Sequence, residues 1–342
     1  MGENNEYRLT KQVKIYGWSC KLGSNQLDEL LERTGLKGNY EDAAVISIPN
    51  TDMVQVKNID IFTPIVDEPD IMGEIAACNV TNDIFAMNVL NVSGMLVFLA
   101  INTNTPMNIA EGILKGIKHF MEKKIDSKIV GGHTIYSEWP LIGGEASGFA
   151  NKKSIISKQG VKKGDKLLLT KPIGLQAVMA AYRMLKDFPE MLGEYSPGEL
   201  KKSIDLAIKI MTTSNRSVVK TIHSYKDFSF IHAMTDITGF GLSGHLKEML
   251  QNSGLSAVLD TIPSINLSKD LSNDFGYDFT ECLCSETAGG MLLSIDPKKI
   301  EDFSNALFSN GISNWTVGSI DSIEHELVRI SDKVKQIEIT EI

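Results

Sequence analysis

Aspartates set inside apolar segments are the residues of this sequence whose type and position best suit chemistry. Asp42 precedes one apolar segment, Asp60 lies within a second, and Asp236 lies within a third. A buried carboxylate without a partner is costly to desolvate, and few lysines or arginines are near these three in the sequence. Magnesium takes hard oxygen ligands, typically one or two carboxylates together with waters and phosphates. A single aspartate at a strand end is more often a cap or a solvated turn residue, so a metal site requires several of them to meet.

A fourth acid lies in a segment with helical spacing. Apolar residues between about Ile71 and Met87 recur at helical intervals and predict a helix. Asn79 and Asp83 are four residues apart and therefore share one face of it. This face can add a carboxylate and an amide to the same metal site.

The glycine-rich segment after Asp236 resembles a nucleotide-binding turn. Gly239–Gly244 matches G-x-G-x-x-G between a strand pattern and a helix pattern, and Asp260 has about the spacing of a ribose-binding acid. Asp236 would repel a bare pyrophosphate at this turn but suits one carried on a metal. We therefore reject a dinucleotide-binding fold, and the lack of G-x-x-x-x-G-K-[ST] argues against a Walker-type ATPase. His245, one turn into the following helix, is expected to form a structural hydrogen bond.

The composition is that of a soluble globular protein that does not bind polyanions. The 342 residues are 42% hydrophobic and 23% charged, with a formal net charge of -9. No block of lysines and arginines offsets this charge, so nucleic acid and anionic lipid are not expected as partners. A small nucleotide can still bind through metal ions. The longest apolar stretch, Val92–Ile101, is too short to span a bilayer, and the N-terminus lacks the apolar core of a signal peptide.

The cysteines indicate a reducing compartment. They are too few and too scattered for a disulfide framework: Cys20, Cys78, Cys282 and Cys284. The pair at 282 and 284 lacks a second pair of ligands for structural zinc. We expect reduced thiols and a cytoplasmic protein.

The order of predicted elements places the chain in the α/β or α+β class. A Gly-rich arm over residues 16–23 precedes an amphipathic helix over about 24–33. Strands are predicted over about 43–48, 54–62, 92–101, 129–132, 166–170, 230–235, 290–295 and 312–319, with further helices over 107–123 and from about 176, 197 and 244. The composition turns polar and basic over 151–164, where we place a boundary. The predicted parts are the arm with the first helix (1–40), an ATP- and magnesium-binding α/β domain (41–155) and a second α/β domain (156–342).

Five segments carry a resemblance to a known family. They are Glu41-Asp-Ala-Ala-Val45, Phe62-Thr-Pro-Ile-Val-Asp67, Asn79-Val-Thr-Asn-Asp-Ile-Phe-Ala-Met87, Gly131-Gly-His-Thr134 and Ala233-Met-Thr-Asp-Ile-Thr-Gly-Phe-Gly-Leu-Ser-Gly-His-Leu246. In this order they resemble the selenophosphate synthetases (selenide, water dikinases), and Gly17-x-x-Cys20-Lys21 fits the same family. The wider superfamily includes aminoimidazole ribonucleotide synthetase, thiamine-phosphate kinase and the hydrogenase-maturation dehydratase. It implies two α/β domains with mixed sheets flanked by helices, usually in a homodimer with ATP near the subunit interface.

The resemblance implies an ATP- and magnesium-dependent phosphotransferase that converts ATP, selenide and water into selenophosphate, AMP and orthophosphate. It implies that Asp42, Asp60, Asp83 and Asp236 hold magnesium, that Asp60 and Asp83 lie on the ATP–metal cluster, and that Asn79 supports them. Phosphoryl transfer requires mostly positioning and charge neutralisation, which metal ions and a lysine supply.

Two further groups of residues receive roles from the resemblance. Lys21 would reach phosphate oxygens from a mobile Gly-rich arm, whose closure would exclude water. Cys20 beside it is either a reactive thiol or a small packed residue in a turn. Gly132, His133 and Thr134 would contact the nucleotide from the partner subunit.

The sequence departs from the family at the reactive position. The family's reactive cysteine or selenocysteine lies three positions before the lysine, where this chain has Trp18, which cannot act as a nucleophile or carry selenium. The segment Cys284–Gly290 follows the family's Asp-Pro-Gln-Thr-Ser-Gly-Gly only in part. Two alternatives therefore stand beside selenophosphate synthesis. One is another ATP-dependent enzyme of the superfamily, acting on a sulfur compound or a small amide or amine metabolite. The other is a nucleotide-binding paralogue without catalysis.

Overall fold

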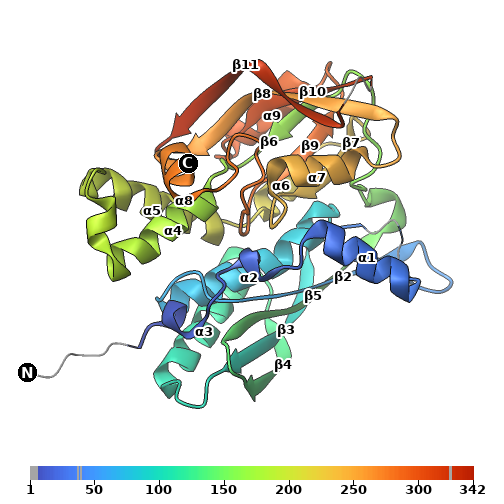
Figure 1. Cartoon of the computed structure of the whole chain (residues 1–342). Coiled ribbons are helices and arrows are strands. Elements are labelled where there is room, and N and C mark those ends of the chain that lie inside the picture. Colours follow the sequence, from blue (N-terminus) through green and yellow to red (C-terminus); the bar gives the residue numbers. More distant parts are fainter. Residues whose placement is uncertain (1–6, 37, 39–40, 323–325) are drawn as a thin grey trace, which may run out of the picture.

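The computed structural model describes residues 7–36, 38, 41–322 and 326–342, which form two mixed β-sheets with helices around them (Figure 1). The first sheet has the strand order β1-β2-β5-β3-β4. Its strands are β1 (Ala44–Ser47), β2 (Met53–Phe62), β3 (Val92–Ile101), β4 (Ile129–Tyr136) and β5 (Leu141–Asn151). The second sheet has the order β11-β8-β10-β6-β9-β7. Its strands are β6 (Lys166–Leu169), β7 (Ile231–Asp236), β8 (Leu255–Ile265), β9 (Met291–Ile295), β10 (Trp315–Ser322) and β11 (Val328–Ile339).

The helices of the described chain lie mostly between and beside the sheets. They are α1 (Ser24–Thr34), α2 (Pro69–Ala86), α3 (Met107–His119), α4 (Leu175–Asp187), α5 (Pro197–Thr212), α6 (Arg216–Ile222), α7 (Gly241–Leu250), α8 (Ser268–Phe275) and α9 (Ile300–Ser309). Figure 1 shows α2 and α3 beside the first sheet, and α4, α5 and α8 grouped at one side of the second half. Within the described part of the chain, none of the helices combines the length and the apolar character that a membrane span requires.

Helix α2 is central because most of its residues are buried, on more than one side of the helix. It begins at Pro69, whose fixed φ and missing N–H suit the first position of a helix. Gly73 allows α3 to pack closely, since a Cβ atom there would lie 2.1 Å from the carbonyl oxygen of Ile113. Helix α2 packs on β2 and β5 of the first sheet and also against β7 of the second. Polar side chains on α2 are therefore held between the two halves of the molecule.

Most predicted elements lie close to their predicted limits, with two differences that matter for the site. Helix α7 begins at Gly241, so Gly241 and Gly244 lie in its first turn and only Gly239 and Phe240 of the glycine-rich segment precede it. Strand β4 runs to Tyr136 because it pairs in parallel with β3 along its length. His133 consequently lies within a strand, whereas the sequence placed it at a strand end.

The sequence missed strand β5, which lies between β2 and β3 in the first sheet. Its glycines at 143, 144 and 148 lower strand propensity and hid it. A Cβ atom at Gly143 would lie 1.9 Å from the carbonyl oxygen of Asp60, so this glycine is required for the close approach of β5 to β2. The same pairing holds the backbone of Asp60 in the sheet. The longest strand, β11, was also missed, because it is largely exposed and lacks the apolar alternation of a buried strand.

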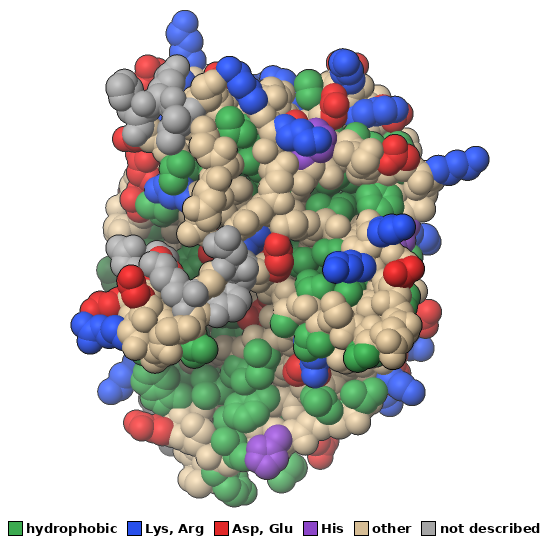
Figure 2. All heavy atoms as spheres, turned by 90° about the vertical axis from the view of Figure 1, so that its right-hand side faces the viewer, with side chains coloured by type: hydrophobic (Ala, Val, Ile, Leu, Met, Phe, Trp, Pro, Cys, Tyr) green, Lys and Arg blue, Asp and Glu red, His purple; other side chains and the backbone are tan. Residues whose placement is uncertain are grey.

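One face of the first sheet carries several apolar side chains that no described residue covers fully. Ile59 on β2 and Leu96 on β3 both pair with Glu145 on β5, so they project from the same face. Their exposed fractions are 66% and 44%, and Phe149 on the same face of β5 is 48% exposed. Figure 2 shows hydrophobic side chains gathered on the lower part of this side of the molecule, where the first sheet lies. An exposed apolar area of this kind marks an interaction surface.

Candidate active site

A pocket of about 300 Å³ lies where the arm, the first sheet, α2 and the second half of the chain meet. Its volume suits a small-molecule ligand. The described residues that line it are Trp18, Lys21, Leu27, Asp28, Leu31, Gly38, Glu41, Asp42, Asp60, Asp83, Lys158, Asp236, Thr238, Phe240, His245, Glu248 and Gln251. Most of the charged side chains among the described lining residues are carboxylates, and the basic ones are two lysines and one histidine.

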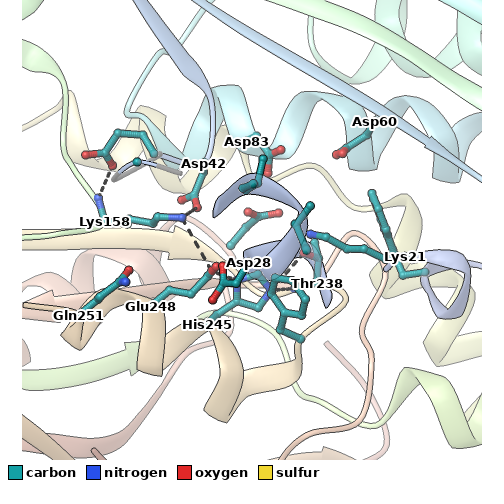
Figure 3. Close-up of a pocket in the computed structure, with 17 residues that line it drawn as sticks. Lys21, Asp28, Asp42, Asp60, Asp83, Lys158, Thr238, His245, Glu248 and Gln251 are labelled. Atoms are coloured by element: carbon teal, nitrogen blue, oxygen red, sulfur yellow. Dashed lines mark hydrogen bonds and ion pairs between the residues drawn. The ribbon is translucent and has the colours of Figure 1, made fainter. Parts of the chain in front are cut away.

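The structure brings the four predicted aspartates together in this pocket. Asp42 precedes β1, Asp60 lies on β2, Asp83 lies on α2, and Asp236 ends β7. Figure 3 shows the carboxylates of Asp42, Asp83 and Asp60 along one side of the pocket. Residues from both halves of the chain thus form one acidic centre.

Burial and mutual repulsion make these carboxylates hard to ionise. Burial raises the pKa of Asp42 to about 6, helped by the charge of Asp236 and opposed by Lys158. Burial also raises the pKa of Asp60 to about 7, again with help from Asp236. The pKa of Asp83 lies well above its ordinary value because of burial and the charges of its three acidic neighbours. Such a centre is stabilised by cations and destabilised by their absence.

Two amides fix the carboxylate of Asp60. Asn58 donates to its Oδ2 atom over 3.1 Å, and Asn79 donates to the same oxygen over 3.0 Å. The Oδ1 atom of Asn79 accepts hydrogen bonds from the backbone N–H of Ala288 and from the indole N–H of Trp18, each over 2.9 Å. These two donors fix the orientation of the Asn79 amide, so that its NH₂ group faces Asp60.

A lysine stands at each end of the row of carboxylates (Figure 3). Lys158 lies 3.4 Å from Asp42 and 3.8 Å from Glu248. Lys21 approaches from the other end, with its ammonium 4.3 Å from the ring centre of Phe240 and 5.3 Å from that of Trp18. The aromatic faces hold this cation without neutralising it, which leaves it available to an anionic ligand.

The glycine-rich turn is part of the pocket wall and does not form a dinucleotide site. Gly241 has a φ of +69° and lies against the backbone oxygens of Cys282 and Cys284 at 2.7 Å from its Cβ position, so a side chain is excluded there. His245 accepts a hydrogen bond from the backbone N–H of Thr238 over 3.1 Å, which is the structural role expected of it. Asp260 is exposed on β8 and does not line the pocket.

The N-terminal arm is fastened to both halves of the molecule. Trp18 is 7% exposed and stacks on Phe62 with ring centres 5.5 Å apart. Farther back, Arg8 contacts Asp67 over 2.7 Å and Asp187 on α4 over 2.5 Å. Thr10 donates to Asp67 through its backbone N–H over 2.8 Å and its hydroxyl over 2.6 Å. These contacts hold the arm over the pocket in the position that places Lys21 there.

Two groups of predicted residues lie outside the pocket. Cys20 is half-buried beside Lys21 but is not among the lining residues. Gly132, His133 and Thr134 lie on the exposed edge strand β4, so within one chain they do not reach the acidic centre. Their predicted contact with nucleotide requires a second subunit.

Other residues of the pocket were not identified from the sequence. Lys158 lies in the polar, basic segment that suggested only a boundary, and its place opposite Asp42 depends on how the two halves pack. Phe240 and Glu248 depend on the same packing. Trp18 was identified as a departure from the family, but its hydrogen bond to Asn79 has no signal in the sequence.

The chain is similar to proteins of one superfamily over almost its whole length. The family described as AIR synthase related protein matches residues 40–150 with its N-terminal domain and residues 162–329 with its C-terminal domain. A solved structure described as AaThiL complexed with AMPPCP and TMP has a TM-score of 0.69 at 18% identity, covering 92% of this chain and 94% of that chain. Hydrogenase maturation protein HypE in complex with ATP has a TM-score of 0.62 at 17% identity, covering 91% and 89%. The two sheets and the acidic centre between them therefore belong to an AIR synthase related protein.

Sequence similarity places the chain more narrowly. The selenide, water dikinase of Methanocaldococcus jannaschii is 37% identical over 98% of this chain and 99% of its own length. The chain belongs to the selenide, water dikinase family.

Proposed function

We propose that this protein is a magnesium-dependent selenide, water dikinase, which converts ATP, selenide and water into selenophosphate, AMP and orthophosphate. The observation that carries the proposal is the meeting of Asp42, Asp60, Asp83 and Asp236 in one pocket with a lysine at either end. A bare triphosphate would be repelled by so many carboxylates, whereas metal ions can bridge the two sets of negative charge. The name and the near-complete coverage of the Methanocaldococcus relative support selenide as the acceptor.

The chemistry of the carboxylates fits magnesium carried with a nucleotide. The Oδ2 atoms of Asp42 and Asp236 are buried and have no hydrogen-bond partner among the described residues. No three acidic, histidine or cysteine side chains of the described chain converge closely enough to hold an ion by themselves. Magnesium does not need such a cage, because it keeps waters and binds one or two carboxylates plus phosphates. Asp42, Asp60, Asp83 and Asp236 would supply the one or two carboxylates that each magnesium ion needs, and when bound the metal supplies charge neutralisation for the transferred phosphoryl group.

The chain's own residues have separable tasks in this proposal. Lys21 and Lys158 contact phosphate oxygens from opposite ends of the pocket and stabilise the charge that spreads over them during transfer. Asn79 and Asn58 orient Asp60. The arm covers the pocket and limits the entry of water, which would otherwise take the phosphoryl group intended for selenide. Trp18 offers no thiol, so selenide would be the direct acceptor.

Phosphorus NMR of ATP and magnesium, with and without selenide under anaerobic conditions, tests the proposal. We expect selenophosphate and AMP only when selenide is present. Formation of ADP with another acceptor would instead indicate another ATP-dependent enzyme of the superfamily. Binding of ATP without turnover would indicate a nucleotide-binding paralogue without catalysis.

The proposal includes a homodimer formed through the exposed apolar side chains on one face of the first sheet. Ile59, Leu96 and Phe149 supply an apolar surface. A second copy would also bring the edge strand with His133 and Thr134 toward the nucleotide, which accounts for predicted site residues that lie outside the pocket. Ile59→Glu should give a monomer by sedimentation, with Phe308→Glu, at an exposed position on α9, as the control. A wild-type monomer at micromolar concentration would contradict this part. The four free cysteines of the structure also suit a reducing cytoplasm.

A further inference from the structure

A second, much smaller cavity has Trp18 in its wall, as the acidic pocket does. Its volume is about 20 Å³, enough for one water-sized occupant. Trp18 lines both this cavity and the acidic pocket, so the two are adjacent. The lining of the small cavity contains no carboxylate.

Arg183 of α4 gives this cavity its positive charge. Its guanidinium lies 3.9 Å above the ring centre of Tyr16. Among the described residues, none accepts a hydrogen bond from it or forms an ion pair with it, although a guanidinium has five N–H donors. The neighbouring acid on the same helix, Asp187, is already bound by Arg8 and Lys11. Arg183 therefore lines the cavity with N–H donors that no described residue accepts from, while the charges of Asp187 and Asp67 act on it without direct contact.

Thr287 provides a second group without a partner. This threonine is only 3% exposed, and its hydroxyl has no hydrogen-bond partner among the described residues. It lines the same cavity as Arg183, together with the polar side chains of Ser19, Gln176 and Tyr277. A hydroxyl that faces a cavity and has no partner in the protein can donate a hydrogen bond to an occupant of that cavity. Guanidinium and hydroxyl groups that can both donate into one small space are complementary to an anion.

We infer that the cavity between Arg183 and Thr287 binds a small monovalent anion, which, if the proposed function holds, is hydrogen selenide. Hydrogen selenide is a monoanion near neutral pH and has a single heavy atom. The acidic pocket repels such an ion, whereas the small cavity attracts it and keeps it one side chain away from the nucleotide. The arm residue Trp18 lines both sites and Tyr16 lines the small cavity, so a movement of the arm would join the two sites.

A binding experiment tests the cavity without any turnover. Full-length protein carrying Trp139→Phe and Trp315→Phe retains Trp18 as its single tryptophan, because the chain has three. Sodium hydrosulfide, added anaerobically at constant ionic strength, should change its fluorescence in a saturable way, whereas the same concentration of chloride should not. Arg183→Met should weaken the hydrosulfide response at least about tenfold and Thr287→Val by a smaller factor. Arg329→Met, at an exposed position on β11, should leave it unchanged.

Kinetics provide the second readout. Arg183→Met should raise the KM for selenide about tenfold or more while the KM for ATP changes less than about twofold, and Arg183→Lys should recover part of the loss. An unchanged selenide KM in Arg183→Met, or a hydrosulfide response equal to that of the parent, would overturn the inference. An equal response to chloride would show a general anion site and would reject hydrogen selenide as its specific ligand. If no selenide-dependent AMP forms at all, the proposed function fails while the fluorescence titration still decides whether the anion site exists.

Discussion

The acidic pocket and the root of the N-terminal arm, where Arg8 and Thr10 contact Asp67, both contain buried carboxylates. The charges around these carboxylates differ between the two regions. In the pocket, Asp60 and Asp83 face other acids, and their pKa values are raised. At the arm root, Asp67 faces Arg8 and Lys186; although burial opposes it, hydrogen bonds from Thr10 and Arg8 lower its pKa. Like charges held together destabilise the free protein, whereas opposite charges with well-placed donors stabilise it. Clustered carboxylates, as in the acidic pocket, are expected where a ligand brings the missing cations. Paired charges, as around Asp67, are expected where the contact stabilises the fold itself.

The largest effect is expected when the acidic centre loses its middle carboxylate. Asp83→Asn should lower magnesium-dependent ATP turnover by at least about 100-fold, because charge neutralisation of the triphosphate depends on this centre. The same change removes a repelled, buried charge, so the free energy of unfolding of the ligand-free protein should stay equal or rise by about 1 kcal/mol. Steady-state AMP release and denaturant titration measure the two quantities.

The control for this variant is Asp205→Asn, at an exposed position on α5, which should alter neither quantity. Turnover retained by Asp83→Asn would remove Asp83 from the active centre. A marked loss of stability would show that its charge is structural.

At the root of the arm, removal of a carboxylate is expected to lower the free energy of unfolding. Asp67→Asn leaves Arg8 and Lys186 without their shared carboxylate and should reduce the free energy of unfolding at pH 7 by about 3 kcal/mol. The folded pKa of Asp67 lies below its ordinary value of 3.8, so its contribution is present above that pH and is lost as the pH falls through the folded pKa.

Urea titrations at pH 7 and near pH 3 measure this difference, which should shrink at the lower pH. Lys201→Met, which breaks an exposed ion pair with Asp205, is the matched control and should change stability by less than about 0.5 kcal/mol. An equal loss at both pH values would mean that packing rather than charge holds Asp67.

Glu286 tests whether a raised pKa alone marks a functional centre. It is 2% exposed and accepts hydrogen bonds from the backbone N–H groups of Gly174 and Leu175, at the first turn of α4. Burial raises its pKa to about 8, against these two donors. Between its ordinary value of 4.5 and about 8 the folded state holds a proton that the unfolded state has lost, so stability should fall as the pH rises through this window.

Glu286→Gln cannot ionise and should therefore flatten this fall, by about 1 to 2 kcal/mol between pH 6 and pH 8. Turnover per folded molecule should remain within about twofold, because Glu286 does not line the acidic pocket. Thermal unfolding across this pH range, compared with AMP release, separates the two effects. A large loss of turnover in the folded variant would show that α4 and its cap control the active centre.

The sequence predicts those features of the fold and of the acidic pocket that depend on neighbouring residues in the chain, and fails for those that depend on tertiary packing. The helix containing Asn79 and Asp83 follows from spacing, and the acids at strand ends follow from their apolar flanks. Their convergence follows from the family resemblance, because no short-range rule brings β2, α2 and β7 together. Lys158 depends on the packing of the two halves and could not be predicted. Strand β5 was hidden by glycines whose purpose, the close approach to β2, is visible only in the sheet.

Trp18 connects the two compared regions, since it lies on the arm fastened at Arg8 and donates to Asn79, which in turn donates to Asp60 of the acidic pocket. Trp18→Phe keeps an aromatic ring against Phe62 but removes the pyrrole part of the indole with its N–H group, so Asn79 loses one of the two donors that orient it toward Asp60. One hydrogen bond of this kind contributes about 1 kcal/mol, equivalent to roughly a fivefold loss of turnover.

Trp18→Cys should lose more than Trp18→Phe, because it also removes the stacked ring that keeps the arm and Lys21 over the pocket. Measuring ATP turnover and the KM for ATP in both variants distinguishes orientation of Asn79 from closure of the arm, since only the second should raise the KM strongly. A gain of selenide-dependent activity in Trp18→Cys would contradict this prediction. It would mean that a thiol at position 18 contributes more to turnover than the stacked indole ring does, and that the fixed position of the arm limits the rate.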